Sequence, residues 1–352
     1  MNILQISSAS SFGGGERYLA DLTNALSARG HDLYVAVRPN SPLPRHLRLP
    51  SERIVTLPLR NALDVQSAYA LDRFVRRRRI EIVHAHMARD YSLASYAGRR
   101  RETKFIVTRH VLFPLSRLHR RTLARAARVI AVSQAVASEL RASGIVNERQ
   151  IAVVPNGVDI DRFKLTCAES HSGLLVGSIG ELRTLKRHDD FIRAAAQVAS
   201  RFPEAKFVLA GTGEGREQLE QLVVELGLSD RFRFLGWVEE AEKLLCEMDV
   251  FVSASETESF GLAIVEAMAA ETAVVATATE GAQEVVEDQK TGFLVPIGDV
   301  DRIAEAVNKL LGDPKQRHEI AARAKQAANE KFSLTRMVDE IEKIYLDTDE
   351  HG

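Results

Sequence analysis

Cysteine, tryptophan and long apolar runs are scarce in this 352-residue chain. Its two cysteines, Cys167 and Cys246, cannot by themselves form a disulfide framework or a zinc cluster. No stretch approaches the roughly 20 apolar residues of a membrane span, and the start at Met1–Ile6 lacks the basic, then apolar pattern of a signal peptide. With 45% hydrophobic and 27% charged residues, collagen-like and disordered classes are also excluded. We expect a cytoplasmic globular protein of two domains.

The formal net charge of only −1 conceals two oppositely charged halves. Residues 1–165 contain 27 Lys and Arg against 13 Asp and Glu, a net of +14, whereas residues 166–352 contain 20 against 35, a net of −15. This asymmetry indicates halves with different partners, one of them anionic. Attraction between two domains across a cleft would explain the same asymmetry and stays open as an alternative.

Both halves alternate short apolar runs with longer amphipathic stretches. The expected strands of the first half are Asn2–Ser7, Leu33–Val37, Ile80–Ala85, Phe105–Thr108, Val129–Val132 and Ile151–Val154. Those of the second half are Leu174–Ser178, Lys206–Ala210, Phe232–Leu235, Val250–Ser253 and Ala273–Ala276. Strands that alternate with helices predict βαβ units and parallel sheets covered on both faces.

Helical spacing is expected over Glu16–Arg29, Asp189–Arg201, Glu214–Leu226, Glu239–Glu247, Gly261–Ala270 and Leu334–Leu346, with one long amphipathic stretch from Asp299 to Lys331. The turn at Pro155–Gly157 and the polar residues up to Ser172 separate the halves. We therefore predict domains at residues 1–164 and 165–331, followed by a terminal segment, 332–352. Two doubly wound α/β domains would bind ligands at the carboxyl ends of their strands.

The segment from Glu258 to Glu266 carries the clearest chemical signal. It follows the expected strand Val250–Ser253 and opens the expected helix Gly261–Ala270, so its first backbone N–H groups lack intrahelical partners. These donors and the helix dipole suit a phosphate or a sugar oxygen. The two carboxylates would lie about 10 Å apart, at two ends of one elongated ligand, and each can accept two hydrogen bonds from a vicinal diol. Both could instead be solvent-facing acids favoured by the helix dipole.

This segment resembles the Glu-seven residues-Glu signature of glycosyltransferase family 4, the retaining GT-B glycosyltransferases. Further landmarks occur in the family order: Gly13-Gly14 with Glu16, Pro155–Asp159 with Arg162-Phe163, Gly211–Gly215 and Thr291–Val295. Together they cover nearly the whole chain. The resemblance implies a GT-B fold of two Rossmann-like domains facing a central cleft. The first domain would bind the acceptor and the second a nucleotide sugar, and residues 332–352 would return to the first domain.

The resemblance also implies roles for single residues. Glu266 would bind the nucleotide ribose and Glu258 the hydroxyls of the transferred sugar. Backbone groups would contact the base, sugar and phosphates at Gly236, Val238, Phe260, Gly261 and Leu262. Trp237 would either stack on the base or pack at a helix entry. Gly13 and Gly14 would let the backbone of the first domain approach the diphosphate.

Fixed cations are expected to stabilise the departing nucleoside diphosphate, which carries two or three negative charges. The family usually has an Arg and a Lys in a Gly-Arg-Leu…Lys-Gly segment after the first strand of the second domain. This chain reads Gly180-Glu181-Leu182-Arg183-Thr184-Leu185-Lys186-Arg187. Lys186 matches the family lysine, but Glu181 occupies the place of the arginine. We expect Arg183 or Arg187 to supply the missing cation.

His110 resembles the family's cleft histidine near the transferred sugar. Its imidazole could hydrogen-bond a sugar hydroxyl or act on the acceptor proton. His84 and His86 would share one face of a strand, but no Asp or Cys partner has metal-ligand spacing, so we expect one of them to line the cleft. Asp189-Asp190 falls inside a helical run rather than after a strand. We therefore expect no metal and no cofactor, with a UDP- or GDP-linked sugar as substrate.

Arginines concentrate in the first half, at Arg76–Arg79, at Arg99–Arg101 and within Leu115–Arg128. In the last stretch Arg117, Arg120, Arg121 and Arg125 alternate with apolar residues, which predicts a basic amphipathic helix. Such a helix could dock on an anionic membrane, or it could simply present a solvated face. Nucleic acid is disfavoured because no stacking aromatic residues accompany the arginines.

The expected function is retaining transfer of a hexose or similar sugar from a nucleotide sugar to a hydroxyl acceptor. The acceptor would be a lipid-linked or lipopolysaccharide-type glycan at the inner face of the membrane. A nucleotide-sugar epimerase and a non-catalytic nucleotide-sugar-binding protein, the latter suggested by Glu181, are the alternatives. A dinucleotide-dependent dehydrogenase is disfavoured because no Gly-x-Gly-x-x-Gly follows the first strand.

Overall fold

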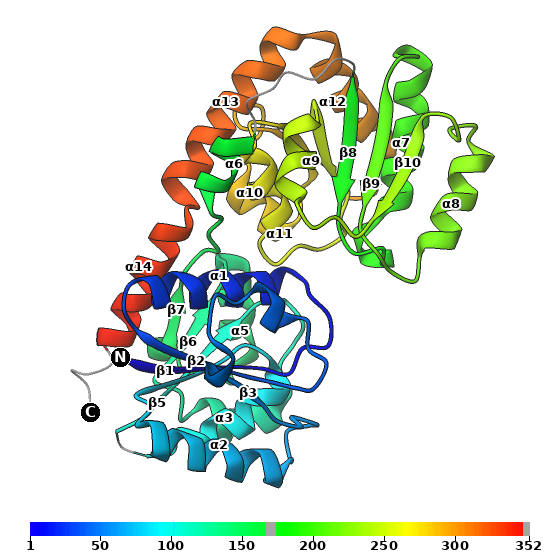
Figure 1. Cartoon of the computed structure of the whole chain (residues 1–352). Coiled ribbons are helices and arrows are strands. Elements are labelled where there is room, and N and C mark those ends of the chain that lie inside the picture. The colour runs from blue at the N-terminus through cyan, green and yellow to red at the C-terminus, as the bar shows by residue number, and fades with distance from the viewer. Residues whose placement is uncertain (101, 167–173, 348–352) are drawn as a thin grey trace. The chain divides into compact units, whose positions relative to one another are not determined.

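The computed structural model of the chain describes residues 1–100, 102–166 and 174–347 and divides into two compact units (Figure 1). The first unit contains residues 1–157 and the chain from Leu334 onward, and the second contains Val158–Ser333. These boundaries differ from those expected after residues 164 and 331. Residues 158–164 belong to the second unit because the helix at Ile160–Thr166 packs against the helix at Ala241–Glu247. Ser333 belongs there too, and it forms a parallel bridge with Val158.

The first unit is a parallel α/β sandwich. Its strands are β1 (Asn2–Ser7), β2 (Asp32–Val37), β3 (Ile54–Thr56), β4 (Ile82–Ala85), β5 (Lys104–Arg109), β6 (Arg128–Ala131) and β7 (Ile151–Val153). Its helices are α1 (Gly14–Ala28), α2 (Val65–Arg78), α3 (Tyr91–Ala97), α4 (Arg120–Leu123), α5 (Gln134–Ser143) and α14 (Leu334–Asp347). Short 3₁₀ turns η1 to η5 lie at Leu43–His46, Ser51–Arg53, Ala88–Asp90, Arg117–His119 and Glu148–Gln150.

The second unit repeats this architecture. Its strands are β8 (Leu175–Ile179), β9 (Lys206–Ala210), β10 (Phe232–Gly236), β11 (Val250–Ser253), β12 (Ala273–Thr277) and β13 (Phe293–Val295). Its helices are α6 (Ile160–Thr166), α7 (His188–Arg201), α8 (Arg216–Glu225), α9 (Ala241–Glu247), α10 (Leu262–Ala269), α11 (Glu280–Val285), α12 (Val300–Gly312) and α13 (Pro314–Lys331). The 3₁₀ turn η6 occupies Thr184–Lys186.

Each sheet reverses its strand order once. The orders are β3-β2-β1-β4-β5-β6-β7 and β10-β9-β8-β11-β12-β13, and every pairing is parallel. The reversal points therefore lie between β1 and β4 in the first unit and between β8 and β11 in the second. At such a point the loops that follow adjacent strands diverge, which leaves room for a ligand at the carboxyl edge of the sheet.

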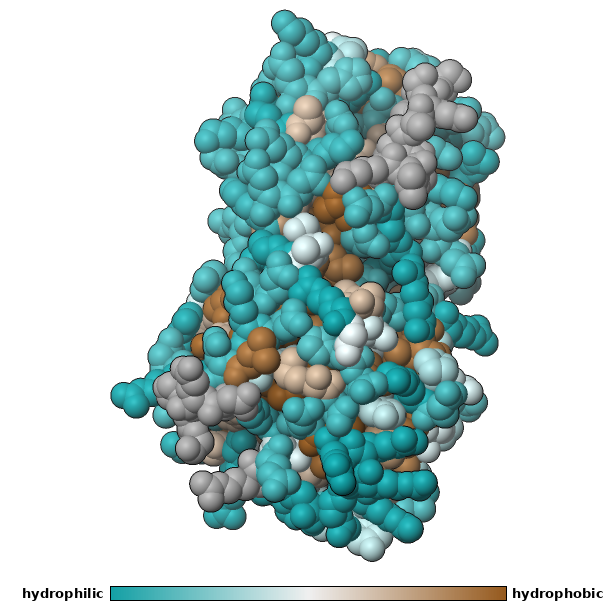
Figure 2. Space-filling view, turned by 60° about the vertical axis from the view of Figure 1, so that its left-hand side comes forward, coloured by the Kyte–Doolittle hydropathy of each residue, from teal (hydrophilic) through white to brown (hydrophobic). Residues whose placement is uncertain are grey.

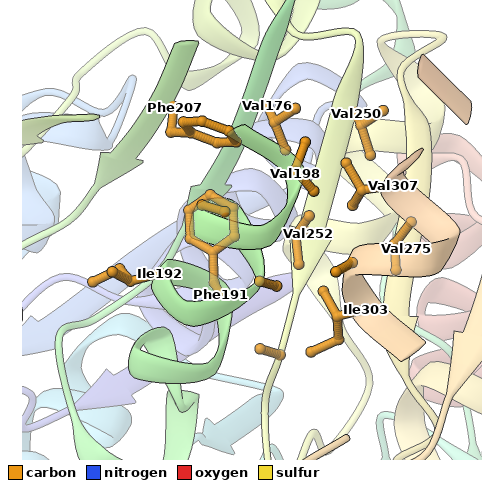
Figure 3. Close-up of a cluster of buried hydrophobic side chains, with 14 of the residues drawn as sticks. Val176, Phe191, Ile192, Val198, Phe207, Val250, Val252, Val275, Ile303 and Val307 are labelled. Atoms are coloured by element: carbon orange, nitrogen blue, oxygen red, sulfur yellow. The ribbon is translucent and has the colours of Figure 1, made fainter. Parts of the chain in front are cut away.

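Apolar packing on both faces of each sheet explains why its strands are nearly continuous apolar runs. Figure 3 shows side chains of β8, β9, β11 and β12 facing α7 and α12 in the second unit; the labelled residues are Val176, Phe191, Ile192, Val198, Phe207, Val250, Val252, Val275, Ile303 and Val307. In the first unit α14 completes the core, because Met337, Val338, Ile341 and Tyr345 pack in one cluster with side chains of β1, β4, β5 and α1.

One expected helix is wrong in extent, and one amphipathic stretch is divided. The stretch Leu115–Arg128 forms only η4 and the single turn of α4, because Leu123 and Ala126 turn into the core and Ala127 donates to the Phe105 carbonyl at 2.8 Å where β6 begins. The stretch from Asp299 to Lys331 is two helices, because Asp313 caps the second helix and Pro314 occupies its first turn.

The face of the molecule shown in Figure 2 is mostly polar. Figure 2 shows hydrophilic residues over most of the visible face, with small separate hydrophobic patches. In the described part of the chain no helix is both long and apolar enough to cross a bilayer.

Candidate active site

In the second unit the loops after β8 and β11 meet at the reversal point of the sheet. Lys186, at the end of η6, extends its Nζ to within 2.5 Å of Glu258 Oε1, and Ser255 Oγ donates to the same oxygen at 2.8 Å. Both side chains are mostly buried, with 32% of Lys186 and 16% of Glu258 exposed. Because both contacts fall on Oε1, Oε2 of Glu258 has no hydrogen-bond donor among the described residues.

The loop that carries Glu258 is tightly held. Its Glu256 N–H donates to the Leu185 carbonyl at 2.9 Å, and the Gly281 N–H donates to the Glu258 carbonyl at 3.1 Å. A Cβ at Gly281 would lie 2.5 Å from the Glu258 carbonyl oxygen and 2.6 Å from the Phe260 nitrogen, so only glycine permits this approach. Glu258 is therefore placed by the backbone of α11 as well as by Lys186.

The start of α10 presents backbone donors beside this carboxylate. Gly261 caps the helix with a φ of 91°, a left-handed conformation that favours glycine. The N–H groups of Gly261, Leu262 and Ala263 have no hydrogen-bond acceptor in the described part of the chain, as expected for a first helical turn. Phe260 is buried against Phe332, so its ring stays in the core while the neighbouring backbone lines the loop.

The glycine turn after β9 supports the Lys186 loop by close backbone contact. A Cβ at Gly211 would lie 1.8 Å from the Gly180 carbonyl oxygen, and one at Gly213 would lie 2.5 Å from that of Leu182. The backbone of Leu182 also donates to Thr212 at 3.0 Å. These glycines let two loops touch, which is a packing role at the edge of the site.

Both candidate replacement cations are engaged in ion pairs. Arg183 Nε lies 2.7 Å from Glu181 Oε1, with 61% and 49% of the two side chains exposed. Arg187 Nε donates to Asp190 Oδ2 at 2.6 Å, and its Nη1 lies 4.0 Å from Glu256. This hydrogen bond to the Asp190 carboxylate raises the pKa of Arg187 above its ordinary value. An exposed pair such as Arg183–Glu181 contributes little stability, so it can open at low cost when an anion binds.

The other expected donor-binding residues lie at the same carboxyl edge. Glu266 is on the second turn of α10 and is half-buried. Gly236 ends β10 with a φ of 67° and accepts from the Gly211 N–H at 2.7 Å. Trp237 is 53% exposed and Val238 is half-buried beside it.

In the first unit the glycine loop after β1 starts α1. Gly13 and Gly14 are exposed, and Gly13 is the extended N-cap whose N–H donates to Glu16 Oε2 at 3.1 Å. Burial raises the pKa of Glu16 above its ordinary value. Gly15 faces the ring of His110, since a Cβ there would lie 3.8 Å from His110 Cδ2.

A hydrogen-bonded cluster of histidines lies at the adjoining strand ends. His110 Nε2 lies 3.3 Å from His86 Nδ1, and His86 Nε2 lies 2.7 Å from Gln5 Oε1. Gln5 Nε2 donates to the Tyr345 hydroxyl at 3.4 Å, and that hydroxyl lies 2.7 Å from His84 Nδ1. His86 is thus the one of the two strand histidines that contacts His110, and the expectation that one of them lines the cleft stays a prediction.

Burial keeps these imidazoles neutral. It lowers the pKa of His84 and of His110 to about 3, and it lowers that of His86 well below its ordinary value of 6.5. Asp90, next to the end of β1, responds in the opposite direction, since burial raises its pKa to about 6. Asp90 accepts from the Ser8 N–H at 2.8 Å through Oδ2, and its buried Oδ1 has no partner among the described residues.

The arginines expected to form an acceptor or membrane surface are all exposed: Arg117, Arg120, Arg121 and Arg125. They lie on and beside η4 and α4, close in sequence to the exposed side chains of Phe113 and Leu118. Arg109 donates to the Phe113 carbonyl and His119 lies against Ala88, so this loop is tied to the sheet and to η3. The arginines at 76–79 and 99–100 are partly neutralised, because Arg76 and Arg99 both pair with the buried Asp72. Arg101 lies outside the described residues.

No set of three or more His, Cys, Asp or Glu side chains in the described ranges could hold a metal ion. The three histidines instead form hydrogen bonds within their cluster: His86 bonds to His110 and Gln5, and His84 to Tyr345 and Thr108.

Sequence comparisons assign the chain to a family. Residues 12–162 match the profile described as Glycosyltransferase Family 4, and residues 164–327 match Glycosyl transferases group 1. The lipopolysaccharide core biosynthesis glycosyltransferase LpsE of Rhizobium meliloti (strain 1021) is 31% identical over 341 residues, which cover 93% of this chain and 94% of that protein. The chain belongs to the group 1 glycosyltransferases.

Other relatives and structures agree with this assignment. The glycosyltransferase is 28% identical to N-acetyl-alpha-D-glucosaminyl L-malate synthase of Bacillus anthracis, over 81% of this chain and 79% of that protein. HepE of Anabaena, solved in complex with UDP and glucose, has a TM-score of 0.85 at 22% identity and covers 99% of this chain and 100% of its own. Sucrose-phosphate synthase of Thermosynechococcus elongatus has a TM-score of 0.80 at 22% identity, with complete coverage of both chains. The fold is GT-B, as expected.

Several residues that shape the site are not evident from sequence reasoning. Gly281 is in a helix, where glycine lowers stability by about 1 kcal/mol relative to alanine. A glycine at such an unfavourable position can indicate a close backbone contact, and this was the only sequence feature that pointed to it. His188 donates through Nε2 to the Glu181 carbonyl at 3.2 Å, and burial lowers its pKa to about 4. Gln5 is a polar residue inside an apolar strand, which marks a buried polar contact. Tyr345 gave no signal, because it is 340 residues from its partner Gln5.

The buried histidines predict that the glycosyltransferase loses stability on acidification. In the unfolded chain His84, His86 and His110 take up protons below about pH 6.5, whereas in the folded state they stay neutral to much lower pH. The free energy of unfolding should therefore fall as the pH falls, by up to about 1.4 kcal/mol per pH unit for each histidine. Asp90, protonated in the folded state below about pH 6, offsets only one of the three. Thermal unfolding of the first unit at pH 7, 6 and 5 measures the slope.

A pair of variants assigns this slope to the cluster. His84→Gln should reduce the proton uptake on unfolding by about one, whereas His318→Gln, on the exposed surface of α13, should leave it unchanged. Identical pH slopes in the wild type and in His84→Gln would show that the buried histidines do not control acid stability.

Proposed function

We propose that this glycosyltransferase transfers a hexose or similar sugar from a UDP- or GDP-linked donor to a hydroxyl of a glycan acceptor. The proposal rests mainly on the Lys186–Glu258 pair, which lies beside the unsatisfied N–H groups at the start of α10. This arrangement offers a cation and backbone donors for phosphate and a carboxylate for hydroxyls, within a few residues of one another. HepE, solved with UDP and glucose and with UDP-glucose, supports a nucleotide sugar as donor.

In this proposal the donor lies along the carboxyl edge of the second sheet. Glu258 binds hydroxyls of the transferred sugar, and Glu266 binds the ribose. The backbone of Phe260, Gly261 and Leu262 binds the sugar and phosphates, and the segment from Gly236 to Val238 meets the base. Lys186 leaves its pairing with Glu258, or shares it, to neutralise the diphosphate as negative charge develops there.

Arg183 is the better candidate for the missing family arginine. Its exposed pair with Glu181 can open, whereas Arg187 is held by Asp190 from a left-handed backbone position and lies near Gly298. Once opened, Arg183 can turn its guanidinium toward a phosphate, where bidentate contact is favourable. In this proposal Glu181 holds Arg183 in an ion pair until the donor binds, and Arg183 supplies the positive charge of the family arginine.

The first unit supplies the acceptor side of the proposed reaction. Gly13 and Gly14 bring backbone toward the diphosphate, and His110 hydrogen-bonds a sugar hydroxyl. An imidazole whose pKa lies near 3 is a weak base, which disfavours His110 as the group that takes the acceptor proton. The acceptor oxygen instead forms its bond to C1 as the C1–phosphate bond breaks, and the departing diphosphate takes both the electron pair and the proton. Attack on the same face gives retention, and no metal is required.

Transfer is favoured over the two alternatives. The relatives named above are a glycosyltransferase and a glucosaminyl malate synthase, and this chain matches two glycosyltransferase profiles, which supports transfer over epimerisation of a nucleotide sugar. Glu181 suggested a protein that binds a nucleotide sugar without turnover. Its carboxylate is paired with Arg183 and does not pair with Lys186. Incubation of a donor with and without acceptor separates these functions by their products.

Loss of the cations should slow transfer. Lys186→Ala and Arg183→Ala should each lower kcat by at least about tenfold, equivalent to about 1.4 kcal/mol, because each removes positive charge from the diphosphate. Steady-state release of nucleotide with a donor identified by thermal stabilisation measures the effect. Arg193→Ala, an exposed cation on α7, is the matched control and should retain wild-type kcat. Wild-type turnover in Lys186→Ala would refute the proposed donor site, and in Arg183→Ala it would remove Arg183 from it.

We further infer that the surface formed by Arg117, Arg120, Arg121 and Arg125 docks on an anionic membrane. The four guanidinium groups form no ion pair with a described carboxylate, and the neighbouring side chain of Leu118 is 88% exposed. Cations beside exposed apolar side chains suit the headgroup region of a lipid bilayer. The printed function of LpsE, lipopolysaccharide core biosynthesis, supports a membrane-associated glycan as acceptor.

Sedimentation with vesicles tests the docking surface. The wild type should bind phosphatidylglycerol-containing vesicles more strongly than neutral vesicles at low salt, and less so at high salt. The triple variant Arg117→Ala/Arg120→Ala/Arg121→Ala should bind about a hundredfold more weakly, at on the order of 1 kcal/mol per arginine. Val224→Ser, which changes an apolar side chain exposed in the second unit, should match the wild type. Equal binding to anionic and neutral vesicles would contradict docking through these arginines.

A further inference from the structure

Two side chains donate hydrogen bonds to one oxygen of Glu258. Lys186 Nζ lies 2.5 Å from Glu258 Oε1, and Ser255 Oγ lies 2.8 Å from the same atom. An ammonium group has donors only, so Oε1 is an acceptor and carries no carboxyl proton. The Ser255 hydroxyl must therefore donate to it as well. The direction of both hydrogen bonds is fixed by the chemistry of the groups that form them.

The two donors differ in how firmly the chain holds them. Ser255 is 2% exposed, and its carbonyl accepts a hydrogen bond from Thr277 Oγ1 at 2.5 Å. Thr277 is itself buried at the end of β12, and the next residue, Glu256, donates its N–H to the Leu185 carbonyl. Lys186 is 32% exposed, and its flexible four-carbon stem lets the ammonium group move without any change in the backbone. Ser255 is thus the fixed donor and Lys186 the movable one.

We infer that Ser255 is a positioning residue that keeps Glu258 Oε1 hydrogen-bonded when Lys186 turns to the diphosphate of the donor. Oε2, which has no hydrogen-bond donor among the described residues, then remains the oxygen available to the hydroxyls of the transferred sugar. The inference rests on the proposed function, because that function supplies the diphosphate for Lys186 and the sugar for Glu258. It gives Ser255 a role that requires no contact with the substrate.

Burial of Glu258 makes the second donor necessary. Only 16% of the Glu258 side chain is exposed, so departure of Lys186 would leave a carboxylate oxygen with little access to water. A bound sugar would exclude water further, and a buried charged group without a hydrogen-bond partner is strongly destabilising. The hydrogen bond from Ser255 to this oxygen is of the stronger, charge-assisted kind. The Gly281 N–H holds only the backbone carbonyl of Glu258 and cannot fix its carboxylate.

Crystal structures of two ligand-free variants test the positioning role without any substrate. Lys186→Ala removes the movable donor, as binding of the nucleotide sugar is proposed to do. Ser255 Oγ should then stay within about 3.0 Å of Glu258 Oε1, with the carboxylate in its present orientation. In Lys186→Ala/Ser255→Ala the carboxylate should turn away from this place. A carboxylate that leaves Ser255 in Lys186→Ala, or that stays in place in the double variant, would overturn the inference.

Binding measurements test the consequence for the donor. Isothermal titration of UDP-glucose and UDP, and in parallel of GDP-mannose and GDP, gives the affinities with and without a sugar. Ser255→Ala should weaken binding of the nucleotide sugar by about tenfold, near the lower end of what a hydrogen bond to a charged group contributes. Binding of the nucleoside diphosphate alone should weaken by less than about twofold, because water reaches Glu258 when the sugar position is empty. Ser200→Ala, which changes an exposed serine of α7, should match the wild type for every ligand.

A purely structural role of Ser255 gives a different result. If loss of its hydroxyl distorted the loop, Lys186 and the first amides of α10 would move as well, and affinity for UDP or GDP would fall as much as affinity for the nucleotide sugar. Equal losses, or no loss for either kind of ligand, would overturn the inference. A wild type that binds none of the four ligands would instead contradict the proposed function, and the two variant structures would still decide the role of Ser255.

Discussion

The ion pair between Lys186 and Glu258 joins two loops that the topology of the second sheet would otherwise separate. β8 and β11 are neighbours, but the chain leaves them in opposite directions, so their loops diverge at the carboxyl edge. The pair bridges this divergence at 2.5 Å, and Gly281 supports the same loop from behind. Together these contacts place one carboxylate, one ammonium group and the first amides of α10 close to one another. Because the Glu258 loop contacts Gly281 so closely, even an alanine at position 281 should displace this loop.

The first unit solves a different physical problem at its own reversal point. Its strands are buried on both faces, yet they contain Gln5 and His84, which must find partners where water is excluded. They do so in a chain of hydrogen bonds that leads to His110 at one end and to Tyr345 at the other. In such a chain each neutral imidazole can use one nitrogen as a donor and the other as an acceptor. Burial thereby keeps the histidines neutral and hydrogen-bonded at the cost of stability in acid.

Much of this structure could be predicted from sequence because the relevant signals are local. Apolar runs such as Val250–Ser253 predict buried parallel strands, as found. The strand–loop–helix context of Glu258 predicts a ligand site at the strand ends, which stays a prediction. Three-residue strands such as β3 and β13 are too short to give a pattern. The helix expected at Leu115–Arg128 fails because its apolar residues enter the core separately and the chain must extend into β6. Gly281 and Tyr345 act through contacts with distant parts of the chain, which no sequence spacing records.

The central claim is that the loops joined by Lys186 and Glu258 form the donor site. Hydrogen–deuterium exchange of the full chain, with and without a stabilising nucleotide sugar, measures this most directly because the unsatisfied amides at the start of α10 are the proposed ligand contacts. The account predicts slower exchange on binding for the amides of residues 261–263 and for the loop of residues 180–187. Protection confined to other parts of the chain, with these amides exchanging as in the unliganded protein, would contradict it.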